Sequence, residues 1–222
     1  LSSSSAASDV YKRQLIHNFG VTNQEIYPSL SLCLGPCEIS VSELASAYTA
    51  FANKGIHVSP LFVTKIEDSE GNVVGEFYPK MNEVISEESS LRMLEMLQSV
   101  IDNGTGGRIR YKYHFTAPMA GKTGTTNRHS DGWFVGITPR LVGACWVGGE
   151  NRDIHFDNMT YGQGASMALP IWAYFMKKVY RDKSLGYTEQ EQFDYPPNYS
   201  SCGQTANDSL QYSANGIDRT FE

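Results

Sequence analysis

Apolar residues recur at helical spacing directly after a polar capping sequence near position 40. Ser40 and Glu43 have the spacing of a capping box, in which the serine hydroxyl accepts a backbone N–H and the glutamate reaches back. Gly55 suits the position just after a helix end. The pattern predicts a helix over residues 41–53, with an apolar face formed by Leu44, Ala45, Tyr48, Phe51 and Ala52.

Two further apolar patterns follow, the first with the composition of strands and the second with the period of a helix. Residues 60–67 and 73–78 are rich in β-forming residues, and the polar segment 68–72 between them is typical of a hairpin turn. Ser86 is suited to begin the next helix, and Asn103, which precedes a glycine, is suited to end it. The apolar stripe of this helix comprises Leu91, Leu94, Met96, Leu97, Val100 and Ile101.

The pattern after the second helix predicts three strands and a final helix. The strands are expected at residues 118–126, 131–138 and 141–149, with a tight turn between the last two. An amphipathic helix is expected at 165–181, although Pro170 within it raises the alternative that the helix begins near that proline. The order helix, hairpin, helix, three strands, helix predicts an α+β fold with an antiparallel sheet.

The two ends of the chain differ from this middle part. Residues 1–14 end in Asp-Val-Tyr-Lys-Arg-Gln, which resembles the translation of an adapter used in preparing sequencing libraries. We expect this segment to be a read-through artefact, the alternative being a natural N-terminal tail. Residues 184–222 are rich in Ser, Asn, Gln and Tyr and are predicted to be a polar, disordered C-terminal tail. The folded part is therefore expected at residues 15–183.

Composition narrows the classes of function. Of the 222 residues, 41% are hydrophobic and 19% are charged, which is enough apolar surface for a folded core. The formal net charge is −6 and the sequence has no stripe of Lys and Arg, which argues against a nucleic-acid-binding protein. No segment approaches the roughly 18 to 20 apolar residues that a membrane-spanning helix needs.

Metal and cysteine chemistry receive little support from the sequence. Cys33 and Cys37 are either two free thiols or a local disulfide, and Cys145 lies in an apolar strand and is expected in the core. No metal and no cofactor is expected, because no histidine pairs with another His, Cys or carboxylate at the spacing of metal ligands. The histidines are His17, His57, His114, His129 and His155.

The segment Ala120–Thr126 carries the most informative chemistry. Lys122 supplies a positive charge, and the hydroxyls of Thr123 and Thr125 can donate hydrogen bonds to a carboxylate. Gly124 has no Cβ, so a ligand backbone could lie against the strand. A P-loop is excluded because the sequence lacks its first glycine. Lys-Thr-Gly alone would also fit a strand that runs into a polar turn.

Several motifs around this segment, taken in order, resemble the C-terminal part of the transpeptidase domain of a penicillin-binding protein. The resemblance covers residues 15–182, and its nearest branch is the class A enzymes, which join a glycosyltransferase domain to a transpeptidase domain. It implies an α+β fold of the penicillin-binding protein and serine β-lactamase type, truncated at its N-terminus. The motifs are Glu43–Tyr48, Gly104–Gly106, Gly121–Thr126, Asp131–Gly136, Thr138–Pro139, Trp146–Gly148 and Ala168–Trp172.

The resemblance implies an acyl-serine D,D-transpeptidase that crosslinks peptidoglycan stem peptides ending in D-Ala-D-Ala. Lys122 would polarise the site and attract the terminal carboxylate of the substrate. Thr123 and Thr125 would bind this carboxylate through their hydroxyls, and the backbone N–H of Thr125 would be an oxyanion donor. Gly124 would leave room for the substrate along the strand. β-Lactams would acylate the same serine.

Two of the three motifs of this family are missing from the sequence. No serine is followed three residues later by lysine, so the Ser-x-x-Lys nucleophile is absent. Ser213-Ala214-Asn215 is the single Ser-x-Asn, and it falls after Lys-Thr-Gly, whereas the family places that motif before it. We expect this chain to be a fragment that does not react with β-lactams by itself.

Other functions stay open at this point. A D,D-carboxypeptidase or β-lactamase of the same fold, and a non-catalytic binding or sensor domain, are the alternatives. Arg128 and His129 lie either at the rim of the cleft or in a solvated turn. Trp133, Phe134 and Trp146 are expected to pack the sheet against a helix. The parent protein is expected on the periplasmic face of the inner membrane, held there by an N-terminal anchor outside this sequence.

Overall fold

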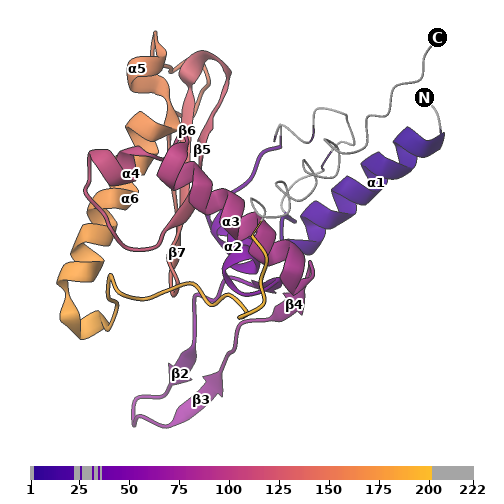
Figure 1. The fold of residues 1–222 in the computed structure, drawn as a ribbon. Helices are drawn as coiled ribbons and strands as arrows, with labels where there is room; N and C mark the ends of the chain where they lie inside the picture. Colours follow the sequence, from indigo (N-terminus) through magenta and orange to yellow (C-terminus); the bar gives the residue numbers. More distant parts are fainter. Residues whose placement is uncertain (1–2, 23–25, 27–31, 33–34, 36, 202–222) are drawn as a thin grey trace, which may run out of the picture.

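The centre of the fold is a three-stranded antiparallel sheet in the order β5-β6-β7 (Figure 1). The computed structural model describes residues 3–22, 26, 32, 35 and 37–201. All three predicted strands are confirmed, each one to three residues shorter than expected. Their bounds are Ala120–Thr125 for β5, Asp131–Ile137 for β6 and Val142–Gly148 for β7.

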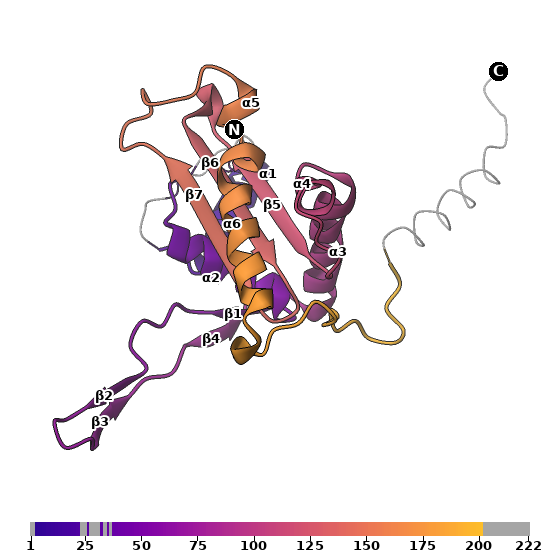
Figure 2. The ribbon, with the colours of Figure 1, turned by 90° about the vertical axis from the view of Figure 1, so that its left-hand side faces the viewer.

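Helices cover both faces of this sheet (Figure 2). Helix α6, Gly164–Arg181, lies along one face and contacts β6 and β7. On the opposite face α2, Val41–Ala52, packs beside β7, and α3, Glu87–Asn103, packs beside β5. The two predicted inner helices and the α+β class are therefore confirmed.

Side chains alternate between the two faces along each strand and so supply two hydrophobic clusters. On the α6 side, Phe134 meets Trp172 edge-on with ring centroids 5.3 Å apart. On the other side, Ile137 and Ala120 pack with Leu94 and Leu97 of α3. Burial of apolar side chains on both faces fixes which face each strand residue takes, since a shift of one residue would reverse them all.

Capping explains where the inner helices begin. The Ser40 hydroxyl accepts the Glu43 N–H at 3.1 Å, and a Glu43 carboxylate oxygen accepts the Ser40 N–H at 3.0 Å. This confirms the predicted capping box. At the start of α3, the Ser86 hydroxyl accepts the N–H of Ser89 at 3.3 Å, without the reciprocal bond of a capping box. Helix α6 begins at Gly164 and continues through Pro170, because residues on both sides of the proline are buried against the sheet.

An arm formed by residues 59–80 projects from the domain (Figures 1 and 2). It contains the antiparallel pair β2, Lys65–Glu67, and β3, Val73–Glu76, which confirms the predicted hairpin with shorter strands. A second pair closes its base, β1 (Ile56–Val58) with β4 (Met81–Glu83). The sequence did not predict this pair, because strands of three residues give too short a pattern to recognise.

Helix α1 and several short elements complete the described part of the chain. Helix α1, Ser3–Asn18, crosses position 14, and just after it Phe19 packs on Phe51 of α2 with ring centroids 5.5 Å apart. None of the helices in the described residues is long and apolar enough to cross a membrane. The remaining elements are α4 (Arg108–Tyr111), η2 (Asn127–His129), α5 (Met159–Gly162) and η3 (Lys183–Leu185).

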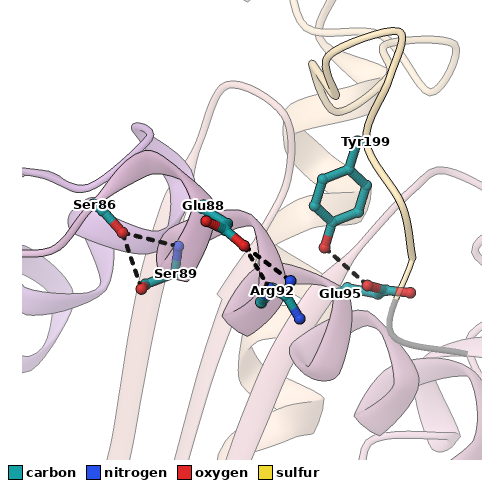
Figure 3. A network of polar contacts seen from close by, with 6 residues as sticks. All are labelled: Ser86, Glu88, Ser89, Arg92, Glu95 and Tyr199. Atoms are coloured by element: carbon teal, nitrogen blue, oxygen red, sulfur yellow. Dashed lines mark hydrogen bonds and ion pairs between the residues drawn. The ribbon is translucent and has the colours of Figure 1, made fainter. Parts of the chain in front are cut away.

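Residues 187–199, here called the strap, depart from the predicted disordered tail. The Tyr195 hydroxyl donates to Oε1 of Gln98 at 2.5 Å. The Tyr199 hydroxyl donates to Oε2 of Glu95 at 2.9 Å (Figure 3). Phe193 packs on the cluster formed by α3. Aromatic residues spaced among the polar ones hold this segment on α3, so residues 184–201 are placed, whereas 202–222 lie outside the described residues.

Candidate active site

Strand β5 lies at one edge of the sheet and carries all four predicted site residues. The N–H of Thr126, just after β5, donates to the carbonyl oxygen of Asp131 on β6. In an antiparallel pair every second residue of a strand hydrogen-bonds to its neighbour, so this bond identifies which residues of β5 face β6. Lys122 and Gly124 direct their backbone groups at β6, and Thr123 and Thr125 direct theirs at the outer edge. No strand of the described residues pairs along that edge.

The polar side chains of β5 are held by local contacts. Lys122 is exposed, and its Nζ donates to the carbonyl oxygen of Thr123 at 2.7 Å. The Thr123 hydroxyl lies 2.7 Å from that of Thr105, and the Thr125 hydroxyl accepts the backbone N–H of Gly164 at 3.0 Å. The ammonium group of Lys122 therefore lies beside the backbone of Thr123, at the outer edge of β5.

The first residue of α6 packs directly against the motif strand. A Cβ on Gly164 would come within 2.3 Å of the carbonyl oxygen of Gly124, so only glycine fits there. Gly124 itself leaves little room on its inner side, where a Cβ would lie 3.0 Å from Cβ of Trp133. Close approach of backbone to backbone thus fixes the position of β5 relative to α6.

The turn after the motif strand has an uncommon backbone. Arg128 and His129 have φ angles of 61° and 59°, in the left-handed region that side chains seldom adopt. Arg128 is exposed, and the His129 carbonyl accepts the N–H of Phe156 at 3.3 Å. The loop before α5 therefore covers part of this turn. Of the two residues, Arg128 is exposed, as the prediction of a solvated turn requires, and His129 is half-buried.

Asp131 is a site residue that the sequence did not single out for a role. Its Oδ2 accepts the Thr126 hydroxyl at 3.1 Å and the Ser130 hydroxyl at 3.3 Å, and its Oδ1 accepts Nε1–H of Trp146 at 3.0 Å. The carboxylate thus joins the end of β5 to β6 and β7. Contacts between residues 15 positions apart leave no periodic pattern in a sequence.

The three aromatic residues of the sheet divide between its faces. Phe134 packs against α6 as predicted. Trp133 and Trp146 instead pack on each other, with ring centroids 6.2 Å apart, on the opposite face, and Trp146 is 40% exposed. The prediction of helix packing is therefore wrong for these two, because α2 and α3 leave this end of the face uncovered. The side chain of Lys122 lies on the same face.

Metal and thiol chemistry is not supported by the placed residues. No group of three His, Cys, Asp or Glu side chains within the described residues could hold a metal ion. Burial raises the pKa of both placed cysteine thiols, Cys37 and Cys145, so neither is an activated nucleophile. Cys33, the other member of the possible disulfide, and Ser213-Ala214-Asn215 lie outside the described residues.

Known proteins that resemble the chain share one family. A family model described as the penicillin binding protein transpeptidase domain matches residues 16–168. Penicillin-binding protein 1A of Aquifex aeolicus is 36% identical over 170 residues, which cover 77% of this chain and 22% of that protein. Its counterpart in Neisseria lactamica is 34% identical over 176 residues, 75% of this chain and 21% of that protein. The chain spans about a fifth of the length of these relatives.

Solved structures share the fold. Penicillin-binding protein 1A from Haemophilus influenzae matches 83% of this chain and 32% of its own, with a TM-score of 0.72 at 24% identity. PonA1 from Mycobacterium tuberculosis, solved in complex with penicillin V, matches 84% of this chain and 53% of its own, with a TM-score of 0.66 at 24% identity. The chain therefore belongs to the transpeptidase domain family of the penicillin-binding proteins and corresponds to part of such a domain in the class A branch.

Proposed function

We propose that this chain supplies the Lys-Thr-Gly side of the active site in a peptidoglycan D,D-transpeptidase. The observation that carries the proposal is the outer edge of β5. This edge presents the backbone of Thr123 and Thr125, along which no strand of the described residues pairs, beside an exposed ammonium group. A stem peptide ending in D-Ala-D-Ala can add to this edge as an antiparallel strand.

Each group on the edge has a distinct task in the proposed reaction. Lys122 attracts the terminal carboxylate of the substrate, and the hydroxyls of Thr123 and Thr125 bind it. The backbone N–H of Thr125 donates to the oxyanion that forms when serine attacks the penultimate D-Ala carbonyl. Terminal D-Ala leaves, and the amine of a neighbouring stem peptide displaces the serine from the acyl-enzyme, which forms the crosslink. β-Lactams would acylate the same serine.

The serine nucleophile must come from residues outside these 222, since no serine here has lysine three positions later. The 222-residue chain is therefore expected to remain unacylated. We propose that the class A parent also has a glycosyltransferase domain and a membrane anchor, neither of which is among the residues described. We propose that this parent acts on the periplasmic face of the inner membrane. We further propose that residues 1–14 are foreign to that protein.

Acylation by a fluorescent penicillin tests the proposal. The full-length product of the gene and the 222-residue chain are incubated with the probe and separated on a denaturing gel. We expect a labelled band for the full-length product alone. In that product, Lys122→Ala should lower the acylation rate by about a hundredfold or more, since it removes a positive charge that is proposed to stabilise the transition state.

Other outcomes separate the alternatives. A labelled 222-residue chain would contradict the assignment of the nucleophile. A full-length product that takes no label would favour a non-catalytic binding domain. Release of D-Ala without crosslinking from stem-peptide substrates would favour a carboxypeptidase, and rapid turnover of the penicillin would favour a β-lactamase.

A further inference from the structure

The loop that joins α3 to α4 consists of Gly104, Thr105, Gly106 and Gly107, so Thr105 has the only side chain beyond a hydrogen among the four. The loop folds tightly on the end of α3. The N–H groups of Gly104 and Gly106 both reach the carbonyl oxygen of Val100, at 3.2 and 3.0 Å. A Cβ on Gly106 would come within 2.7 Å of Cδ1 of Ile101. This fit fixes the backbone position of Thr105.

Arginine side chains anchor the segment just after the loop. Nε of Arg110 donates to Asp102 at 2.8 Å, which joins α4 back to the end of α3. Arg108 donates through Nη1 to the carbonyl oxygen of Ala165 at 3.0 Å and to the Ser166 hydroxyl at 2.8 Å. The loop is thus braced against α3 and against the first turn of α6, the two elements that also flank β5.

From this braced position, the Thr105 hydroxyl lies 2.7 Å from the Thr123 hydroxyl on β5. A hydroxyl has one hydrogen to donate and two lone pairs that accept. A carboxylate can only accept, so a bound carboxylate takes the hydrogen of Thr123. The Thr105 hydroxyl then donates to Thr123, and the two bonds form a chain that strengthens the donor at the ligand.

We infer that Thr105 is a positioning residue that orients the Thr123 hydroxyl toward the substrate carboxylate. It acts through Thr123 and does not touch the substrate. The inference rests on the proposed function, because it assumes that the Thr123 hydroxyl binds the substrate carboxylate. It predicts an effect on ligands that carry a free carboxylate and none on ligands in which the carboxylate is masked.

Thr105→Val removes the hydroxyl with little change in shape, and Thr105→Ser keeps it. Thr64→Val is the matched control, because Thr64 is an exposed threonine in the arm. Each variant is made in the full-length product of the gene. The acylation rate constant and the pre-acylation dissociation constant are measured with benzylpenicillin and with its methyl ester.

With benzylpenicillin we expect Thr105→Val to weaken the pre-acylation complex by about three- to tenfold, the effect of losing one neutral hydrogen bond. Thr105→Ser and Thr64→Val should match the unmodified protein within about twofold, and the methyl ester should not distinguish the variants. Equal affinity of Thr105→Val and the unmodified protein for benzylpenicillin would overturn the inference.

A loss that is equal for the acid and the ester would also overturn it, because that outcome indicates a general disturbance of the strand. Failure of the unmodified full-length product to react with benzylpenicillin would contradict the proposed function itself. The two failures are therefore distinguishable.

Discussion

At the scale of single residues, the position of Thr125 depends on a glycine in another element. The Gly164 N–H donates to the Thr125 hydroxyl, and the Gly164 Cα lies where a larger residue would strike the carbonyl of Gly124. Sequence analysis predicted Thr125 from its motif but gave no role to Gly164. Packing between residues 39 positions apart is decided by tertiary structure, which one sequence does not encode in any local pattern.

Gly164→Ala is expected to displace β5 from α6. The added Cβ would lie 2.3 Å from a backbone oxygen, which cannot move as a flexible side chain could. We expect a loss of about 1–3 kcal/mol in the free energy of unfolding, measured by urea denaturation. In the full-length product, acylation by penicillin should slow as well.

Gly75→Ala is the control for this prediction, since Gly75 lies in the arm and its added Cβ would make only an ordinary contact at 3.7 Å with Phe77. It should leave both the unfolding free energy and the acylation rate close to their original values. An equally stable Gly164→Ala protein would show that β5 and α6 are not held by this close approach.

At the scale of elements, the strap connects the C-terminal part of the described chain to α3. Tyr195 lies on α3 beside Glu95, and Lys54 at the end of α2 pairs with Asp194 of the strap at 2.7 Å. The same helix α3 ends at the loop that carries Thr105. The strap was predicted as disordered because its composition is polar, and composition alone does not show that its aromatic residues are spaced to reach one helix.

Alkaline titration is expected to release the strap. Burial, assisted by the charge of Glu95, raises the pKa of Tyr195 from 10.0 to about 12. The folded state therefore holds the phenol proton more tightly than the unfolded state does. Its contribution to stability is complete below pH 10 and is lost as the pH rises from 10 to about 12.

In an absorbance titration of tyrosinate, Tyr195 should ionise later than an ordinary tyrosine, and Tyr195→Phe should reduce the amplitude of this late step. Tyr180, whose pKa burial also raises to about 12, is the internal reference that remains. Tyr111→Phe is the control, because the Tyr111 side chain is exposed at the end of α4. An unchanged late step in Tyr195→Phe would contradict the position of the strap on α3.

At the scale of the whole molecule, the arm projects away from the central sheet and its helices (Figures 1 and 2). Its exposed apolar side chains include Phe62, Val63, Ile66, Val74 and Tyr78. Its tip, residues 68–72, is tied mainly by hydrogen bonds to Asp68. The pair β1 and β4 closes the arm at its base, so a cut at the tip leaves both halves of the chain in place.

Limited proteolysis with an enzyme that cleaves after acidic residues is expected to cut first at the tip, after Asp68 or Glu70. The two fragments should elute together from a size-exclusion column, because α2 on one fragment packs against β7 on the other. Immediate separation of the fragments would contradict this packing. Asp68→Asn with Glu70→Gln removes the cleavage sites and serves as the control.

Much of the fold was predictable because the central elements are amphipathic and capped. The two inner helices have apolar positions with the correct period, and β6 and β7 are rich in apolar residues, whereas Ala120 is the one apolar side chain of β5. The elements that were missed, β1 and β4 among them, are short and are defined by their partners. In the site, the Lys-Thr-Gly strand was predictable as a motif. The segments that contain Thr105 and Asp131 were also recognised, but the contacts of these two residues and of Gly164 depend on distant segments that meet in the fold.

The outer edge of β5 has a cost for the protein that carries it. A strand that accepts a peptide by backbone hydrogen bonding accepts any other free strand equally well, including β5 of a second copy. The ammonium group of Lys122 opposes such self-association, because two antiparallel β5 edges would bring like charges together. The same lysine that is proposed to attract a substrate carboxylate is thus expected to disfavour edge-to-edge aggregation through β5 when no peptide is bound there.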